Sequence, residues 1–306
     1  MKILLAEYAV GAGLGGTLML EGAAMLGTLV NSFSRLGHEV SYLSSGPLLE
    51  KGKAVISCTE DFESVLENEA ANCDAGLVIG PDEILADLTE IIDSNTINLG
   101  CSPQSVRMCA DKLECTRKLQ SCLINVPRLI TGEHEGLCII KPRFGCASEG
   151  VRISFFNDAA EGYISNEYIK GDHLSVSIIG GKKTLPLSVN KQFIEINSSN
   201  ENSQVSYHGN MVPYRTSYQS ELFDVADATV KALKCNGYVG IDIVHGEKNY
   251  VVDVNPRPTT AIFGLARTLK AEIGDLLLKN ISGTLPESVE IDGEFSFTKD
   301  DFEDIL

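Results

Sequence analysis

Short apolar runs alternate with longer stretches of helical periodicity over the first hundred residues. Residues 2–10 predict a strand, and a glycine-rich turn joins it to a helix over residues 17–35. Two further apolar runs, residues 39–43 and 77–79, predict the next strands. Strands that alternate with helices favour a parallel sheet. We therefore predict an N-terminal parallel α/β domain over residues 1–103 and an α/β fold class, with α+β character in the rest of the chain.

The pattern changes after residue 103 to short strands joined by turns. A hairpin about Gly180-Gly181 and a helix over residues 218–234 are the clearest elements there. Residues 197–206 are polar and rich in turn formers, which predicts a loop beside the substrate. Residues 286–306 are acidic and predict a solvated C-terminal tail. The second domain then covers residues 104–285, with a smaller lobe at about residues 113–170.

Two β-branched runs near residue 250 predict another hairpin. They cover residues 238–244 and 249–255, and His245-Gly246-Glu247-Lys248 supplies the loop between them. With that loop, Asp242 lies opposite Val251. Successive side chains of a strand point to opposite faces of the sheet. The face that suits a core then carries Ile241, Ile243, Val252 and Val254.

Three oxygen-bearing side chains lie on the other face of this hairpin. Asp242, Asp253 and Asn255 come within diagonal reach of one another. Two carboxylates at that distance repel each other unless solvent or a cation separates them. Carboxylate and amide oxygens form a hard ligand set that suits Mg²⁺ shared with substrate phosphates. The alternative is two solvated acids on an exposed sheet face, and the hairpin by itself favours neither.

Two lysines stand where a phosphate site could form. Residues 137–140 are a short apolar strand that ends at Lys141. Small residues follow it at Gly145, Ser148 and Gly150. A lysine beside such a loop neutralises phosphate charge while loop N–H groups approach the oxygens. Lys112 precedes a predicted helix. The alternatives are a solvated charge at a strand end and an ordinary residue in the first turn of a helix.

The order and spacing of these segments resemble the ATP-grasp superfamily of carboxylate–amine ligases, over roughly residues 102–266. The resemblance implies that two lobes enclose ATP, that Lys112 and Lys141 contact its phosphates, and that residues 144–151 cover them. The hinge strand of that family, Glu-Tyr-Ile-x-Gly, lines the adenine. Its matches are Glu167, Tyr168, Ile169 and Gly171. The implied ribose ligand is Asp172 or His173. The implied ligands of two Mg²⁺ ions, which Mn²⁺ can replace, are Asp242, Asp253 and Asn255.

The sequence departs from that family pattern at three places. Cys146 and Ala147 replace glycines of the phosphate loop, so the loop is expected to be stiffer than usual. Asp253 stands where many members have Glu, and its shorter arm shifts one ion or leaves room for a water. Gly240 stands where some members have an arginine, so another arginine must stabilise the transferring phosphoryl group.

Two arginines are candidates for that role. Arg257 lies in Asn-Pro-Arg-Pro, where the flanking prolines fix its backbone. It would steady the substrate carboxylate or the acyl phosphate, while Lys141 acts on the phosphates. Arg215 is the second choice. The alternative for Arg257 is a surface arginine in a rigid turn.

More narrowly, the chain resembles the small archaeal branch of tyramine–glutamate ligases of methanofuran biosynthesis. The resemblance rests on Glu7-Tyr8, the glycine-rich loop, and residues 21–25, 187–192 and 255–258. It implies an amide bond between the side-chain carboxyl of L-glutamate and tyramine, formed through an acyl phosphate with release of ADP and phosphate. A different pair of substrates within the superfamily is the alternative.

Side chains for such substrates can be named from the sequence. Glu21, on the predicted N-terminal helix, is a candidate for a substrate ammonium, and its alternative is an ordinary helix-surface acid. An aromatic amine needs an apolar pocket. Candidate walls are Tyr207, Tyr214 and Phe263.

A rival motif lies near the N-terminus. Residues 11–16 fit G-x-G-x-x-G between a predicted strand and helix, which is typical of dinucleotide binding and would make the chain a nicotinamide-dependent oxidoreductase. An acid should then end the second strand and bind ribose. That strand ends in Tyr42-Leu43-Ser44-Ser45 instead, which disfavours this hypothesis. A third hypothesis is an inactive nucleotide-binding regulator, suggested by Cys146-Ala147.

Composition and charge disfavour several classes of protein. The net charge of −17 disfavours a nucleic-acid surface. We expect no membrane span, since no apolar run approaches 18 residues, and no signal peptide, since Glu7 interrupts the first one. Nine cysteines without a C-x-x-C pair indicate reduced thiols and a cytoplasmic location. The expected partners are small molecules, an amino acid and an amine, with a homodimer left open.

Overall fold

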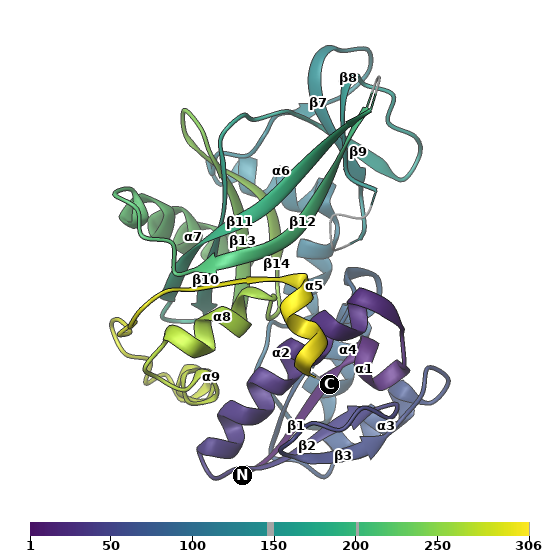
Figure 1. The fold of residues 1–306 in the computed structure, drawn as a ribbon, viewed down its shortest axis with the longest axis vertical. Coiled ribbons are helices and arrows are strands. Elements are labelled where there is room, and N and C mark those ends of the chain that lie inside the picture. The colour runs from purple at the N-terminus through teal and green to yellow at the C-terminus, as the bar shows by residue number, and fades with distance from the viewer. Residues whose placement is uncertain (146–149, 200–201, 306) are drawn as a thin grey trace.

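The computed structural model describes residues 1–145, 150–199 and 202–305. Its first part is a parallel sheet, in the order β3-β2-β1-β4-β5, with helices packed against it (Figure 1). The strands are β1 (Lys2–Glu7), β2 (Glu39–Ser44), β3 (Lys53–Ile56), β4 (Ala75–Ile79) and β5 (Ile97–Asn98). The helices are α1 (Tyr8–Ala12), α2 (Gly16–Arg35), α3 (Phe62–Ala70) and α4 (Asp82–Asn95). The predicted parallel α/β arrangement is confirmed.

The end of β1 differs from the prediction. The strand stops at Glu7 and runs directly into α1, which ends at Gly13 in the left-handed region with φ of 77°. Gly11 lies inside α1, and a Cβ there would be 2.4 Å from the ring of Phe62. Residues 11–16 are therefore not the strand-to-helix loop that dinucleotide binding needs. The first glycine serves close packing instead.

The second sheet is built from antiparallel pairs, in the order β14-β13-β10-β11-β12-β8-β7-β9-β6, with β15 also on β12. Its strands are β6 (Leu129–Ile130), β7 (Glu135–Pro142), β8 (Arg152–Phe156), β9 (Tyr163–Glu167), β10 (Asp172–Gly180), β11 (Leu185–Ser199), β12 (Asn202–Val212), β13 (Gly237–His245), β14 (Asn249–Asn255) and β15 (Phe295–Thr298). The other helices are α5 (Pro103–Ala110), α6 (Lys112–Ser121), α7 (Gln219–Leu233), α8 (Ala261–Thr268), α9 (Ile273–Ser282) and the 3₁₀ helix η1 (Lys299–Ile305). The strands β7, β8 and β9 form the far end of the molecule from the parallel sheet (Figure 1).

The predicted loop over residues 197–206 is wrong. Strands β11 and β12 continue as a paired ribbon out to Ser199 and Asn202. This ribbon reaches β8 and so joins the large sheet to the smaller lobe. Polar residues suit a ribbon that is exposed on both sides, which is why their composition resembled that of a loop.

The hairpin of β13 and β14 contains a bulge that the sequence did not reveal. Asp242 pairs with Asp253, but Ile243 pairs with Val251, so Val252 is an extra residue on β14. The predicted pairing of Asp242 with Val251 is therefore wrong. Val251 rather than Val252 packs in the core, while the three predicted oxygen ligands still share one face.

The C-terminal segment is not a solvated tail. Strand β15 pairs with β12, and the rings of Phe297 and Phe302 are buried at 2% and 0% exposure. Both rings pack against Phe263 in a core shared with α2, and Figure 1 shows the yellow segment lying beside that helix. An acidic composition did not prevent burial, because Phe295 and Phe297 alternate with small polar residues along β15.

Two further observations concern the class of protein. No helix in the described ranges combines the length and apolar character needed to cross a bilayer. The cysteines that the structure describes are free thiols, five of them buried. Cys146 lies outside the described residues.

Candidate active site

A cavity of about 290 Å³ lies between the carboxyl ends of β1 and β4, the face of β13 and β14, and strand β7. Crevices at the carboxyl ends of parallel strands are common ligand sites. Predicted nucleotide residues in its lining are Lys112, Lys141, Gly145, Glu167, Tyr168, Ile169 and His173. Predicted metal ligands and substrate residues in its lining are Asp242, Asp253, Asn255, Glu21 and Arg257.

Some predicted residues lie elsewhere. Asp172 accepts a hydrogen bond from Lys191 at 2.6 Å outside the cavity lining, because side chains alternate along β10 and the next residue, His173, faces the cavity. Of the two ribose candidates, only His173 therefore lines the site. Gly150 also lies outside the lining, with φ of 70° beside Pro142. Ser148, Cys146 and Ala147 lie outside the described residues.

Three predicted substrate side chains also lie away from the cavity. Arg215 is exposed beyond the end of β12 and does not line it. The Lys191 ammonium lies over Tyr214, 5.3 Å from the centre of the Tyr214 ring. Phe263 belongs to the core under the C-terminal segment. Of the predicted aromatic walls, Tyr207 alone lines the cavity.

The acidic face of the hairpin forms one wall. Asp242 accepts hydrogen bonds from Gln192 at 3.0 Å and from Asn255 at 3.4 Å, and it lies across from Asp253. Burial, with added repulsion from Asp253, raises the pKa of the Asp242 carboxyl to about 7. Two acids that face each other in this way are stabilised by a bound cation.

This wall fits a divalent cation that substrate oxygens help to hold. Among the described residues, no group of three or more His, Cys, Asp or Glu side chains could hold a metal ion. The available set is two carboxylates and one amide, which leaves coordination positions open. That is the arrangement expected of Mg²⁺ bound together with phosphates.

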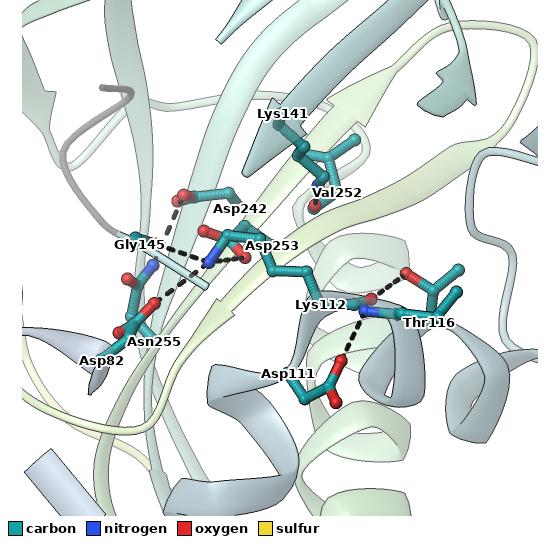
Figure 2. Close-up of polar contacts among 11 residues, drawn as sticks. Asp82, Asp111, Lys112, Thr116, Lys141, Gly145, Asp242, Val252, Asp253 and Asn255 are labelled. Atoms are coloured by element: carbon teal, nitrogen blue, oxygen red, sulfur yellow. Dashed lines mark hydrogen bonds and ion pairs between the residues drawn. The ribbon is translucent and has the colours of Figure 1, made fainter. Parts of the chain in front are cut away.

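Lys112 stands between the acids and the loop (Figure 2). Its Nζ lies 3.0 Å from Asp82 Oδ2, 2.7 Å from the Gly145 carbonyl oxygen and 3.6 Å from Asp253 Oδ1. The side chains of Lys112 and Asp82 are 9% and 7% exposed. Burial raises the pKa of the Asp253 carboxyl, but Lys112 and Lys141 together outweigh that effect, so its pKa lies below the usual value.

The start of α6 fixes Lys112. Asp111 caps the helix by accepting from the backbone N–H groups of Leu113 and Glu114 at 3.1 and 3.2 Å. The same carboxylate accepts two hydrogen bonds from Arg143, at 2.8 and 2.6 Å. The backbone N–H of Lys112 donates to the Arg143 carbonyl oxygen. These bonds join the start of α6 to the end of β7.

Lys141 approaches from the opposite lobe, as Figure 2 shows. Its Nζ donates to the carbonyl oxygen of Val252, the extra residue of the bulge, at 2.7 Å. Burial lowers the pKa of the Lys141 ammonium, and the charge of Asp253 partly offsets that effect. An ammonium has three donors, and among the described residues one of them is used by Val252, so two stay available for a ligand. The bulge thus ties the acidic hairpin to the smaller lobe.

The hinge segment packs closely on the turn of the same hairpin. A Cβ at Gly171 would lie 2.2 Å from the carbonyl oxygen of His245. Only glycine permits this approach, which accounts for the last position of the Glu-Tyr-Ile-x-Gly motif. Gly240 is restricted in a similar way, since a Cβ there would lie 2.5 Å from Thr259. An arginine at position 240 does not fit this structure. Among the described residues, Arg257 is the arginine that lines the cavity.

Three residues of the site were missed from the sequence. Gln192 and Asp82 contact predicted residues, and Glu7 lines the cavity at 5% exposure. Glu7 ends the parallel strand β1 and Asp82 follows the parallel strand β4, and that position was the signal that could have identified them. Burial raises the pKa of Glu7 to about 7, although the Val10 N–H donates to its carboxylate at 2.9 Å.

Glu7 gives a testable pH dependence. Because its pKa rises from 4.5 to about 7 on folding, the folded state binds more protons between these values, and the free energy of unfolding falls as the pH rises. The contribution is on the order of 3 kcal/mol, at about 1.4 kcal/mol per pH unit. Glu7→Gln should remove it, while the exposed Glu67→Gln should not. Urea titrations from pH 4.5 to 7 without Mg²⁺ measure both, and equal slopes in the two variants would contradict the assignment.

Comparison with known proteins gives the same family. A model described as an ATP-grasp domain matches residues 109–261. The tyramine–L-glutamate ligase of Methanocaldococcus fervens is 31% identical over 296 residues, covering 91% of this chain and 93% of that protein. Its namesake in Methanocaldococcus jannaschii is 30% identical over 297 residues, covering 91% and 88%.

Solved structures of other proteins also resemble this chain. An ATP-grasp superfamily protein from Archaeoglobus fulgidus is similar at a TM-score of 0.78 and 30% identity, over 94% of this chain and 90% of that one. Biotin carboxylase from Campylobacter jejuni, solved with an ATP analogue, shares the fold at a TM-score of 0.72 and 15% identity, over 96% and 74%. The matches span the lysines, the hinge and the acidic hairpin described above, and the chain belongs to the ATP-grasp family.

Proposed function

We propose that the protein is an ATP-dependent ligase that joins the side-chain carboxylate of L-glutamate to tyramine through an acyl phosphate. The names of its relatives support this pair of substrates, and the family supports carboxylate–amine ligation. The observation that carries the proposal is the convergence of Lys112, Lys141 and the acidic hairpin on one cavity. A cavity with both cations and acids suits a metal–triphosphate.

The nucleotide roles follow the lining of the cavity. Lys112 and Lys141 bind phosphates, Gly145 presents backbone to them, and His173 binds the ribose. The adenine lies against Glu167, Tyr168 and Ile169. Asp242, Asp253 and Asn255 hold two Mg²⁺ ions, or Mn²⁺, whose charge offsets the negative charge on the transferring phosphoryl group. The low pKa of Asp253 and the repulsion at Asp242 both favour such cations.

Arg257 binds the carboxylate that reacts. Its Nη1 donates to the Pro258 carbonyl oxygen at 3.1 Å, while its Nε is buried and makes no hydrogen bond with any described residue. A guanidinium with a free edge suits bidentate binding of a carboxylate. Arg257 thereby orients an oxygen of the acyl donor toward the γ-phosphorus of ATP.

The reaction then needs positioning more than covalent participation by the protein. The carboxylate oxygen attacks the γ-phosphorus, and ADP leaves. The neutral amine attacks the acyl carbon, the C–O bond breaks, phosphate leaves, and the ammonium proton passes to solvent. Holding the partners in place and offsetting charge supply the rate enhancement. A homodimer remains a prediction, and we propose no partner other than these small molecules.

The test is a ligation assay with complete and incomplete mixtures. Protein, Mg²⁺, ATP, L-glutamate and tyramine should yield ADP, phosphate and an amide of matching mass, and NMR should place the amide on the side-chain carboxyl. Omission of either substrate should stop ADP release. Binding of Mg-ATP without turnover, for a panel of amines and acids, would instead indicate the inactive regulator. Tight NADPH binding without Mg-ATP binding would indicate the oxidoreductase.

A further inference from the structure

A lysine from the C-terminal segment contacts two residues that line the cavity. Lys299 is the first residue of η1, and its Nζ lies 2.8 Å from Glu21 Oε1. The same ammonium stands 5.4 Å from the ring centre of Tyr207. Glu21 and Tyr207 both line the cavity. Their side chains therefore hold a positive charge at its edge.

The backbone fixes this lysine from both sides. Phe297 and Phe302 are buried on either side of it, and the Thr298 N–H donates to Asp301 at 2.6 Å. Strand β15 also lies against Gly209 so closely that a Cβ there would be 2.1 Å from the Phe297 carbonyl oxygen. The position of Lys299 is thus part of the packed fold.

The ion pair leaves hydrogen-bonding capacity unused. Glu21 Oε1 is buried and is paired with the Lys299 ammonium at 2.8 Å. The side chains of Glu21 and Lys299 are 12% and 27% exposed. An ionised carboxylate has about four lone-pair sites, so Glu21 can accept from a ligand N–H while it stays paired with Lys299. The ammonium of Lys299 likewise has donors to offer.

The Glu21–Lys299 pair and Arg257 belong to the surroundings of one cavity. The Tyr207 hydroxyl bonds with Thr260 at 2.8 Å and lies in the electrostatic field of both Glu21 and Asp242. Glu7, on the floor of the cavity, lies in the field of both Glu21 and Arg257. Glu21 and Arg257 line the same cavity, so a small molecule bound there can contact both Arg257 and the Glu21–Lys299 pair.

We propose that Glu21 and Lys299 recognise the zwitterionic end of an amino acid. Lys299 binds the main-chain carboxylate of the acyl donor, Glu21 accepts from its ammonium, and the side-chain carboxylate points to Arg257. The inference rests on the proposed function and adds the recognition of this end to it. Adjacent opposite charges on the protein match the adjacent charges on the α-carbon of the ligand. A donor that lacks one of them loses one charge-assisted contact, which produces discrimination.

Donor analogues test the two residues separately. 4-Aminobutyrate lacks the main-chain carboxylate of L-glutamate, and glutarate lacks its ammonium. Lys299→Met should lower kcat/KM for L-glutamate about 10- to 100-fold, the effect expected for a lost charge-assisted bond, and leave that for 4-aminobutyrate within about threefold. Glu21→Gln should lower kcat/KM for L-glutamate and leave kcat/KM for glutarate unchanged. Lys299→Arg should keep most of the preference for L-glutamate.

Controls separate recognition from folding. Lys270→Met removes an exposed lysine paired with Glu290 and should change none of these values. Calorimetric titration of L-glutamate into protein loaded with a non-hydrolysable ATP analogue should show the same loss of affinity in Lys299→Met. An equal loss for all three donors, or no loss for any, would overturn the inference.

Failure of the proposed substrate has a different signature. If the wild-type protein ligates another amino acid and not glutamate, the glutamate assignment falls, and that amino acid with its decarboxylated analogue tests Lys299 in the same way. If the wild-type protein uses simple carboxylic acids as well as amino acids, the zwitterion site falls while the ligase function stands.

Discussion

Replacing Asp253 with asparagine is expected to lower kcat for amide formation about 10²- to 10³-fold, as for other lost elements of transition-state charge stabilisation. The amide keeps the size of the side chain but removes a charge that Lys112, Lys141 and Arg257 all face. Cations around the triphosphate then lack the ligand that holds them. Initial rates of ADP and amide formation at saturating ATP measure the effect.

Two comparisons make the result specific. Asp224→Asn, on the exposed side of α7, should keep the wild-type rate. Raising the Mg²⁺ concentration should recover part of the loss in Asp253→Asn if the loss lies in metal affinity. A kcat within twofold of wild type in Asp253→Asn would remove the metal role of this hairpin.

Lys112→Met is expected to lower the free energy of unfolding by about 3–5 kcal/mol, the range for removal of one partner from a buried ion pair. The remaining Asp82 carboxylate is 7% exposed and loses its ion partner. Burial already raises the pKa of Asp82 against the opposing effect of Lys112, so the variant should also bind a proton there. Urea unfolding without nucleotide measures the change.

A double variant identifies the cause. Adding Asp82→Asn to Lys112→Met removes the stranded charge and should restore most of the lost stability, because it is the unpaired charge that is costly. ATP binding should stay weak in both, since the lysine is absent. A double variant that is as unstable as Lys112→Met would show that the packing of the lysine stem, and not its charge, stabilises this position.

The site was predictable where residue types and spacing were enough. The alternation along β13 and β14 put Asp242, Asp253 and Asn255 on one face, and that inference survived an error of register. The bulge at Val252 was not predictable, because the apolar run reads equally well with Val251 or Val252 in the core. Its position depends on a contact with Lys141 from a distant part of the chain.

Other features depended on tertiary context. A lone acid such as Glu7 or Asp82 carries no spacing signal, so its place at a strand end emerged only with the sheet. The C-terminal segment was misjudged because net charge was weighed above the alternation of Phe295 and Phe297. The outer end of the ribbon, residues 197–206, was taken for a loop because it is mostly polar and shows too little apolar alternation to indicate a strand.

The bulge in β14 has a consequence for the way residue roles are transferred between related proteins. Suppose that an alignment counts residues from the turn of this hairpin and does not allow for the extra residue Val252. It then assigns Asp253 to the wrong partner on β13. Deletion of Val252 removes the bulge, so Asp253 would follow Val251 directly, point to the face opposite to Val251 and still pair with Asp242. A motif search would report such a protein as intact, although it would lack the carbonyl oxygen to which Lys141 donates.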